Sequence, residues 1–339
     1  MNEKFKNALA AKPQDCPPVW MMRQAGRYHD HYQKLKEKYT FKDLCTNPEL
    51  AAKTALGPID DFDFDASIYF NDILYPLEAL GFSLDYNPGP ILSPTLTPDF
   101  FSQLKSTEEA NSFLSFQKNA VAATRELLPK DKSLIGFIGG PWTLFTYAME
   151  CSHKGHMITS KTQSDLFNRF CEHLLPVLDQ CIKDQLKSGA EVVMIFDTSA
   201  GTLSSFDFNR LVAPTIKKLS MNNAGRVGYY AKETTYHQLE SLADCPLAGL
   251  GFDHRFSIDK VLKNRTHKGF TQGNFDQTLL FSEDSSFEKR FRDYLAPIAE
   301  LSNTQRSGWV CGLGHGILPK TPQENVRKFV QIVREVFHA

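Results

Sequence analysis

The chain has 339 residues, of which 42% are hydrophobic and 23% are charged, and its formal net charge is −1. This composition is typical of a folded globular protein with one large or two ordinary domains. The near-neutral charge argues against a general nucleic-acid binder, which needs a basic excess to neutralise phosphates. No apolar run reaches the ~18 residues that a membrane-spanning helix needs. A small acidic substrate stays compatible with this charge, because a local group of arginines can lie in a neutral protein.

The seven cysteines are scattered along the chain, and no two of them form a Cys-x-x-Cys pair. An odd number of unclustered cysteines indicates reduced, mostly buried thiols rather than a disulfide framework or a zinc ribbon. The first 16 residues contain no long apolar segment of the kind found in secretory signals. These features predict a cytoplasmic protein.

Eight short apolar or aromatic runs recur along the chain, and each predicts a β-strand. The predicted strands are residues 19–23, 66–70, 134–138, 192–196, 226–230, 247–252, 269–273 and 309–313. Most of these runs are almost continuously apolar, as expected for strands of a parallel sheet that is covered on both faces.

Longer stretches with helical character separate these strands. The predicted helices are residues 47–62, 106–128, 162–189, 285–301 and 321–337. Eight strands alternating with helices over about 340 residues fit a single (β/α)₈ TIM-type barrel that spans residues 1–339. In this prediction residues 1–16 form a partly ordered N-terminal extension. A doubly wound sheet is the alternative, but no dinucleotide-binding fingerprint follows the first predicted strand.

Polar side chains and glycines collect directly after the predicted strands. They are Arg23 and Arg27 after the first strand, Asp72 after the second, Tyr147 after the third, Asp197, Thr198 and Ser199 after the fourth, Asn274 after the seventh and His315 after the eighth. Barrel enzymes place their active sites at the C-terminal ends of the strands. The pattern therefore predicts an active site at the C-terminal mouth.

Each of these features also has a simpler structural explanation. Two arginines four residues apart could belong to a charged surface, and an aspartate after a strand could cap the next helix. The tyrosine could be a core residue, the Asp-Thr-Ser run could form a turn, and the glycines beside the histidine could mark a tight turn. No metal site is predicted, because His29 and His31 have no further clustered ligand. The sequence also lacks a P-loop and a Gly-x-Ser-x-Gly nucleophile motif.

Six motifs occur in order between Pro17 and Val326: "PVWMMRQAGRY", "FNDIL", "GFIGGPWTLFTY", "FDTSAG", "QGNFD" and "GLGHGILPKTPQENV". Together they resemble the uroporphyrinogen decarboxylase family. The resemblance implies a (β/α)₈ barrel that acts as a homodimer, with no metal or organic cofactor. It also implies a carboxy-lyase that converts uroporphyrinogen III, a tetrapyrrole, to coproporphyrinogen III by turning four acetate side chains into methyl groups.

The resemblance assigns roles to particular residues. It implies that the Asp72 carboxylate accepts the pyrrole N–H groups at the centre of the substrate, and that Arg23 and Arg27 bind its carboxylates. These three residues are the expected catalytic residues. Further substrate contacts are expected from the backbone N–H groups of Gln24 and Ala25, and from Tyr147, Thr198 and His315. An arginine, a bound water or a substrate carboxyl group could each deliver the proton, and the sequence does not choose between them.

The sequence departs from the family pattern at four places. They are residues 29–31 (His-Asp-His), Lys36 where arginine is usual, Thr198 where serine is usual, and residues 148–156 (AMECSHKGH) in place of a glycine-rich run. Three other functions remain open: a zinc-dependent corrinoid methyltransferase of the same superfamily, a non-catalytic tetrapyrrole-binding paralogue and a sugar-phosphate barrel enzyme. Cys311 lies near a position where the methyltransferases carry a cysteine ligand, but no His-x-Cys pair precedes it.

Overall fold

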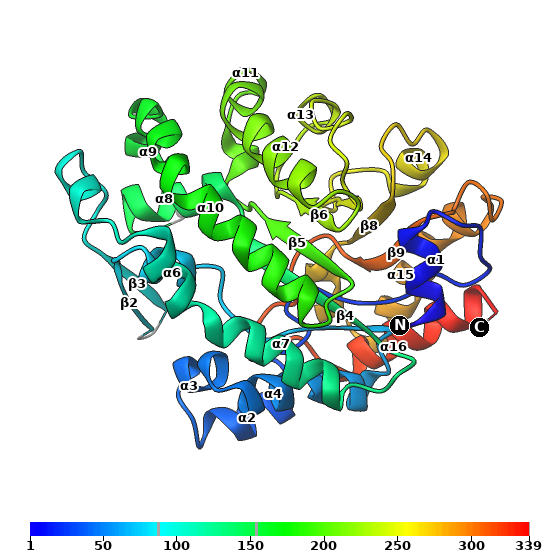
Figure 1. The fold of residues 1–339 in the computed structure, drawn as a ribbon. Helices are drawn as coiled ribbons and strands as arrows, with labels where there is room; N and C mark the ends of the chain where they lie inside the picture. Colours follow the sequence, from blue (N-terminus) through cyan, green and yellow to red (C-terminus); the bar gives the residue numbers. More distant parts are fainter. Residues whose placement is uncertain (87–88, 153–154, 339) are drawn as a thin grey trace.

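The central feature of the fold is a parallel sheet that curls into a barrel (Figure 1). The structure is a computed structural model, and it describes residues 1–86, 89–152 and 155–338. Within these residues the sheet has seven strands in the order β1-β4-β5-β6-β7-β8-β9, and every neighbouring pair is parallel. The strands are β1 (Ala66–Ile68), β4 (Ser133–Gly139), β5 (Val192–Phe196), β6 (Val227–Tyr230), β7 (Gly249–Gly251), β8 (Phe270–Phe275) and β9 (Trp309–Leu313). All seven coincide with predicted strands to within a few residues.

Helices cover the outside of this sheet, as Figure 1 shows for α7, α10, α12 and α15. The α-helices are α1 (Glu3–Leu9), α2 (Asp30–Lys36), α3 (Phe41–Thr46), α4 (Pro48–Phe62), α5 (Tyr75–Ala79), α6 (Thr107–Phe113), α7 (Ser115–Leu127), α8 (Pro141–Glu150), α9 (Ile158–Thr162), α10 (Asp165–Lys187), α11 (Ser205–Asp207), α12 (Ala213–Asn222), α13 (Tyr236–Glu240), α14 (Ile258–Lys263), α15 (Asp284–Ala299) and α16 (Gln323–Val336). Single turns of 3₁₀ or π type are η1 (Asp99–Gln103), η2 (Ala200–Thr202), η3 (Phe208–Val212) and η4 (Gln277–Phe281). Strands and covering helices alternate along the chain, so the fold is the predicted (β/α)₈ TIM-type barrel.

The first predicted strand is wrong in detail, although its residues do occupy the eighth position of the barrel. Only one bridge, between Val19 and Cys311 of β9, joins this segment to the sheet in the described part of the chain. Trp20 N–H donates to the Cys311 carbonyl of β9 (3.3 Å), but its two neighbours are bound to side chains: Val19 N–H donates to the Asp65 carboxylate (2.7 Å) and Met21 N–H donates to the Gln24 amide oxygen (3.2 Å). The segment nevertheless links β9 to the start of β1, since the Asp65 N–H donates to the Val19 carbonyl.

Besides many of the shorter helices, a pair of strands and an N-terminal helix were absent from the predictions. A two-stranded antiparallel hairpin, β2 (Ser83–Tyr86) and β3 (Pro90–Ser93), lies between α5 and η1. Residues 1–16, predicted to be a partly ordered extension, contain α1, whose Phe5 and Ala8 side chains are fully buried. Figure 1 shows the two chain termini close together at this end of the molecule.

Asp65 connects both ends of the chain to the first strand. Its carboxylate is 3% exposed, and it accepts hydrogen bonds from Val19 N–H (2.7 Å) and from the guanidinium of Arg334 in α16 (2.6 Å). Lys4 of α1 lies 3.5 Å away. Removing one partner of a buried ion pair leaves the charge of the other without compensation. The Asp65 carboxylate also accepts the Val19 N–H bond that a neighbouring strand would otherwise accept, so its loss leaves a buried N–H group without an acceptor.

We expect Asp65→Ala to lower the free energy of unfolding by about 3–5 kcal/mol, the usual cost of breaking a buried pair. Urea unfolding followed by circular dichroism measures this change. Glu288→Ala is the matched control, because it removes a carboxylate from the exposed Glu288–Arg292 pair on α15, where solvent screens the interaction. Equal losses from the two variants would contradict the central role of Asp65.

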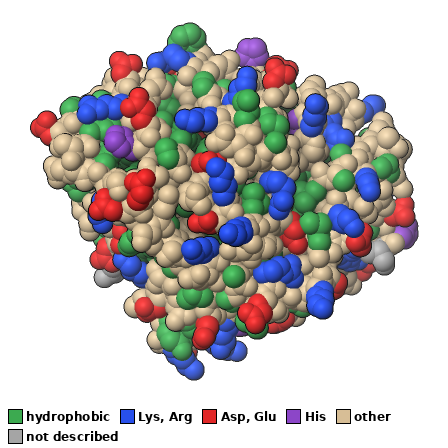
Figure 2. All heavy atoms as spheres, in the orientation of Figure 1, with side chains coloured by type: hydrophobic (Ala, Val, Ile, Leu, Met, Phe, Trp, Pro, Cys, Tyr) green, Lys and Arg blue, Asp and Glu red, His purple; other side chains and the backbone are tan. Residues whose placement is uncertain are grey.

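The surface carries basic and acidic side chains in a mixture, as expected from the net charge of −1 (Figure 2). On the face shown in Figure 2, basic and acidic side chains are interspersed over the helices, with small hydrophobic areas between them. Among the described helices none combines the length and the apolar character that are needed to cross a lipid bilayer.

Candidate active site

The predicted site residues follow the C-terminal ends of parallel strands, and these ends meet at one mouth of the barrel. Asp72 follows β1, Tyr147 lies in α8 after β4, Thr198 follows β5 and His315 follows β9. Electrostatic interactions between Arg23, Asp72 and Tyr147 show that three of these segments come together at the mouth.

Arg23 stands where the segment in the eighth barrel position turns away from the sheet. Its backbone is left-handed, with φ of 60°, which a side chain other than glycine adopts at a cost. The neighbouring backbone is fixed by a hydrogen bond from Ile317 N–H to the Met22 carbonyl (2.9 Å). The Arg23 side chain then runs over Gly316, where a Cβ atom would lie 2.5 Å from its Cδ and 2.8 Å from its Cγ. The glycine after His315 thus leaves room for the stem of this arginine.

We expect Gly316→Ala to displace the Arg23 side chain and to lower kcat/KM about tenfold, with little loss of stability. The added methyl group must push aside the Cγ and Cδ atoms of an otherwise exposed side chain, which can move into solvent. Steady-state kinetics together with a thermal melt measures both quantities. Gly89→Ala is the control, because a Cβ atom at Gly89 meets no atom within 4 Å among the described residues.

The turn after Arg23 is built on Gln24. The Gln24 side chain is fully buried, and its amide donates to the Ala66 carbonyl (3.1 Å) at the start of β1. Its backbone N–H donates to the Met21 carbonyl (3.2 Å), so this donor is already used and Gln24 supports the turn. The Ala25 N–H has no partner in the described parts of the chain, and the exposed Arg27 follows two residues later.

Asp72 lies in the turn between β1 and α5. Its carboxylate accepts a hydrogen bond from Leu74 N–H (2.8 Å) and so closes a turn just before α5, whose N-cap is Leu74. Burial raises the pKa of Asp72 to about 6, while the Leu74 hydrogen bond and the Arg23 charge act in the opposite direction. Asp72 does not cap α5, but its turn role and a functional role are compatible, because one carboxylate oxygen holds the turn and the group still interacts electrostatically with Arg23.

Tyr147 and Thr198 come from the neighbouring loops. Burial raises the pKa of Tyr147, the Asp72 charge raises it further and the Arg23 charge lowers it, so Tyr147 lies within the same electrostatic group. Thr198 is partly exposed. Its loop is held by Asp197, whose buried carboxylate accepts hydrogen bonds from the N–H and the hydroxyl of Thr143 (both 2.7 Å). No interaction joins Thr198 or Arg27 to the Arg23–Asp72 group among residues 1–86, 89–152 and 155–338.

Two features near the mouth were missed by the predictions. The first is Tyr230, whose hydroxyl lies 3.0 Å from Nδ1 of His315 and 2.7 Å from the Gly314 carbonyl. The only signal in the sequence was its place as the last residue of a predicted strand. The second is Arg255, which forms ion pairs with Asp253 (2.9 Å) and Glu233 (2.9 Å) beyond β6 and β7.

The arginines near the mouth differ in whether a carboxylate lies close enough to form an ion pair with them. Arg255 is neutralised by two carboxylates, as described above. Arg23 and Arg27 have exposed side chains and form no ion pair within 4 Å in the part of the chain that the structure describes. Two exposed guanidinium groups without carboxylate partners can bind anionic groups of a ligand, because their planar donor sets match carboxylates.

Of the residues that depart from the family pattern, His29 and His31 lie outside the mouth, against α4. The His29 ring is buried and its Nε2 lies 2.6 Å from an Asp61 oxygen of α4. The His31 ring stacks on His29 at 5.8 Å and contacts the Lys53 carbonyl of α4 (2.9 Å). These histidines fill the space between α2 and α4, behind the arginine turn. In the segment 148–156, His153 and Lys154 lie outside the described residues.

The described residues contain no group of three or more His, Cys, Asp or Glu side chains that could hold a metal ion. Cys311, the residue considered as a possible ligand, is fully buried in β9. Burial raises the pKa of its thiol, Cys16 and Asp65 raise it further and Arg334 lowers it. The Cys311 thiol thus interacts electrostatically with Cys16, Arg334 and Asp65.

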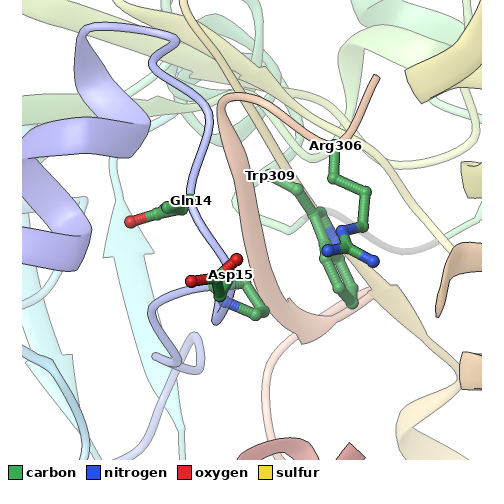
Figure 3. A pocket seen from close by; sticks show the side chains of 5 residues that line it. Gln14, Asp15, Arg306 and Trp309 are labelled. Carbon is green, nitrogen blue, oxygen red and sulfur yellow. The ribbon is translucent and has the colours of Figure 1, made fainter. Parts of the chain in front are cut away.

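Two hollows occur elsewhere on the molecule. One is a shallow depression beside Trp309, the first residue of β9, and thus at the opposite end of the barrel from the mouth. Figure 3 shows Gln14 and Asp15 on one side of this hollow and Arg306 and Trp309 on the other. A groove of about 360 Å³ lies on the outside between α13 and α14. Neither hollow contains a predicted site residue.

Comparison with known proteins finds relatives of this chain in sequence and in fold. The family model for uroporphyrinogen decarboxylase (URO-D) matches residues 1–336. The uroporphyrinogen decarboxylases of Solibacter usitatus and Geotalea daltonii are 30% and 32% identical, and the alignments cover 99% of this chain and 98% and 99% of theirs. A methyltransferase from Methanosarcina mazei has a similar structure, with a TM-score of 0.78 at 22% identity over 99% of this chain and 98% of its own. At that identity the similarity concerns the fold alone. The chain belongs to the uroporphyrinogen decarboxylase family, a family of carboxy-lyases.

Proposed function

We propose that this protein removes CO₂ from the four acetate side chains of uroporphyrinogen III and produces coproporphyrinogen III. The observation that carries the proposal is the presence, at one mouth, of the Asp72 carboxylate and of the exposed Arg23, which interact electrostatically although Arg23 has no carboxylate within ion-pair distance among the described residues. A substrate with N–H donors at its centre and carboxylates around its rim complements such a site. Asp72 would accept the pyrrole N–H groups, and Arg23 and Arg27 would bind the carboxylates.

The chemistry needs an acceptor for the electron pair that CO₂ leaves behind. Protonation of a pyrrole carbon beside the acetate-bearing position makes a cation that takes up this pair when the C–C bond breaks. A second proton then adds to the new exocyclic carbon, and the ring proton is lost. Each turnover thus converts one CH₂–COO⁻ group and one proton into a methyl group and CO₂, with the substrate as its own electron acceptor.

The negative charge of Asp72 would stabilise the cationic ring, because a fixed charge acts more strongly in a partly dehydrated cleft than in water. Burial raises the pKa of Asp72 to about 6, so the group is still ionised at neutral pH. Tyr147, Thr198 and His315 would hold further acetate and propionate groups around the mouth. Arginine is a poor proton donor, so a bound water or a substrate carboxyl group is the better source of the proton.

We further propose that the protein is a cytoplasmic homodimer. All seven cysteines are free thiols, as expected in a reducing compartment. Three large apolar side chains on segments that follow β4, β5 and β6 are exposed: Ile158 (67%), Phe206 (74%) and Tyr236 (53%). Their helices α9, α11 and α13 lie along one edge of the molecule in Figure 1, so a second copy could cover them there. Light scattering of the purified protein measures the mass that this proposal requires.

Anaerobic incubation of metal-free protein with uroporphyrinogen III tests the activity directly. Chromatography of the oxidised products counts the carboxyl groups that remain, and the proposal requires the loss of four. Substrate binding without loss of carboxyl groups would identify a non-catalytic tetrapyrrole-binding protein. Stoichiometric zinc in the protein as isolated, together with no decarboxylation, would favour the methyltransferase alternative.

A further inference from the structure

The buried Tyr230 and the partly exposed His315 lie side by side at the edge of the mouth. Tyr230 is the last residue of β6, and its side chain is fully buried. The two rings are almost parallel, with an angle of 18° and 6.0 Å between their centroids. The Tyr230 oxygen lies 2.7 Å from the carbonyl oxygen of Gly314 and 3.0 Å from Nδ1 of His315. Both neighbours belong to the loop that follows β9.

The proton count of these groups determines which nitrogen of His315 carries hydrogen. A phenol has one proton to donate, whereas a carbonyl oxygen can only accept. The shorter contact is the one to Gly314, whose residue is buried, and a buried carbonyl without a donor would cost free energy. The Tyr230 proton therefore goes to Gly314, and the Tyr230 oxygen accepts a hydrogen bond from Nδ1–H of His315. In the neutral ring Nε2 then carries the lone pair.

We propose that Tyr230 is a positioning residue that holds His315 in the Nδ1–H tautomer, so that His315 meets the substrate through Nε2. This inference rests on the proposed decarboxylase function and specifies how His315 acts in it. A neutral Nε2 accepts a hydrogen bond from a protonated acetate or propionate group, and after protonation the same nitrogen donates to a carboxylate. The bond to Tyr230 is kept in both states, so the ring need not turn when the proton moves.

The tautomer can be measured without any turnover. Protein labelled with ¹⁵N at histidine gives long-range ¹⁵N–¹H correlations that identify the protonated ring nitrogen at a pH where the ring is neutral. The signal of His315 is assigned by its disappearance in His315→Gln. We expect Nδ1–H in the wild-type protein, and in Tyr230→Phe a shift toward Nε2–H, the form that an unconstrained imidazole prefers. Tyr229→Phe is the matched control for this signal, because its hydroxyl interacts with Asp197 instead.

Kinetics provide the second readout. Loss of one neutral hydrogen bond predicts that Tyr230→Phe lowers kcat about tenfold, with a smaller change in KM. An Nε2–H signal for His315 in the wild-type protein would overturn the proposal, and so would Tyr230→Phe with both tautomer and kcat unchanged. A wild-type protein that shows Nδ1–H but does not decarboxylate uroporphyrinogen III would refute the proposed function and leave the tautomer assignment standing. The wild-type spectrum decides the assignment even if a variant fails to fold.

Discussion

Asp72→Asn is expected to lower kcat about 10²- to 10³-fold, the usual effect of removing one preorganised electrostatic group from an active site. The asparagine oxygen can still accept the hydrogen bond from Leu74 N–H, so the turn before α5 is preserved. What is lost is the negative charge beside Arg23. Single-turnover measurements with uroporphyrinogen III separate this loss in the chemical step from weaker substrate binding. Near-normal turnover would contradict the role of the Asp72 carboxylate.

The pH dependence gives an independent check on Asp72. Its pKa is raised by burial to about 6, so kcat/KM of the wild-type enzyme should fall as the pH drops through this value and the carboxylate takes up a proton. Burial also raises the pKa of Asp197 to about 6, so a fall near this pH does not by itself identify Asp72. The residual activity of Asp72→Asn should lack the part of the acidic limb that Asp72 causes, and this comparison identifies the group.

Asp72→Asn should lower the activity of the protein without lowering its stability. The ordinary pKa of an aspartate in an unfolded chain is about 3.9, and the folded value is higher. The folded protein thus binds the proton more tightly, so this group's contribution to stability is greatest below about pH 4 and is lost as the pH rises through about 6. Asp72→Asn removes the cost of the buried charge, and its melting temperature at neutral pH should equal or exceed that of the wild-type protein.

The sequence was sufficient for the strands because their signal is local. β5 and β9 match the predicted ranges 192–196 and 309–313 to the residue, since each is a continuous apolar run that is buried on both faces. The first strand failed for a reason that is not local. The N–H group of Val19 is taken by Asp65, which lies 46 positions further along the chain, and no pattern near residue 19 shows this.

A site residue could be predicted from the sequence only where its type is unusual for its position, such as a charged residue directly after an apolar run. Arg23 and Asp72 follow apolar runs in which a charged group is unusual, and the structure brings these two residues together. Tyr230 was missed because a tyrosine at the end of a strand resembles any other core aromatic. Its role depends on the register of β6 and on the loop after β9, which puts Gly314 and His315 within reach of its hydroxyl.

Arg23→Lys is expected to be more damaging than Arg27→Lys, although both arginines belong to the same motif. Arg23 interacts electrostatically with Asp72, Tyr147 and Tyr230, which come from three different segments of the mouth. The Arg27 guanidinium instead interacts electrostatically with Tyr32 of α2, toward the periphery. Lysine keeps the charge but replaces a planar fork of donors with a point charge.

Loss of a hydrogen bond to a charged group costs about 1.5–3 kcal/mol, which corresponds to a decrease of about 10- to 150-fold in kcat/KM for Arg23→Lys. For Arg27→Lys we expect mainly a higher KM, as for a contact that is equally strong in the ground state and the transition state. Steady-state kinetics of both variants measure the difference. Arg290→Lys on the exposed surface of α15 is the control for the exchange itself. Equal effects of the two motif variants would count against the central position of Arg23.

Combining Arg23→Lys with Gly316→Ala tests whether the glycine acts through the arginine. A Cβ atom at position 316 collides with Cγ and Cδ of Arg23, and lysine places the same two carbon atoms along its own stem. If the only effect of Gly316→Ala is to displace the guanidinium, the variant has little left to disturb once that group is gone. The double variant should then lose much less than the product of the two single losses, because residues in direct contact are not independent. Fully multiplicative losses would show that Gly316 shapes the loop around His315 by another route.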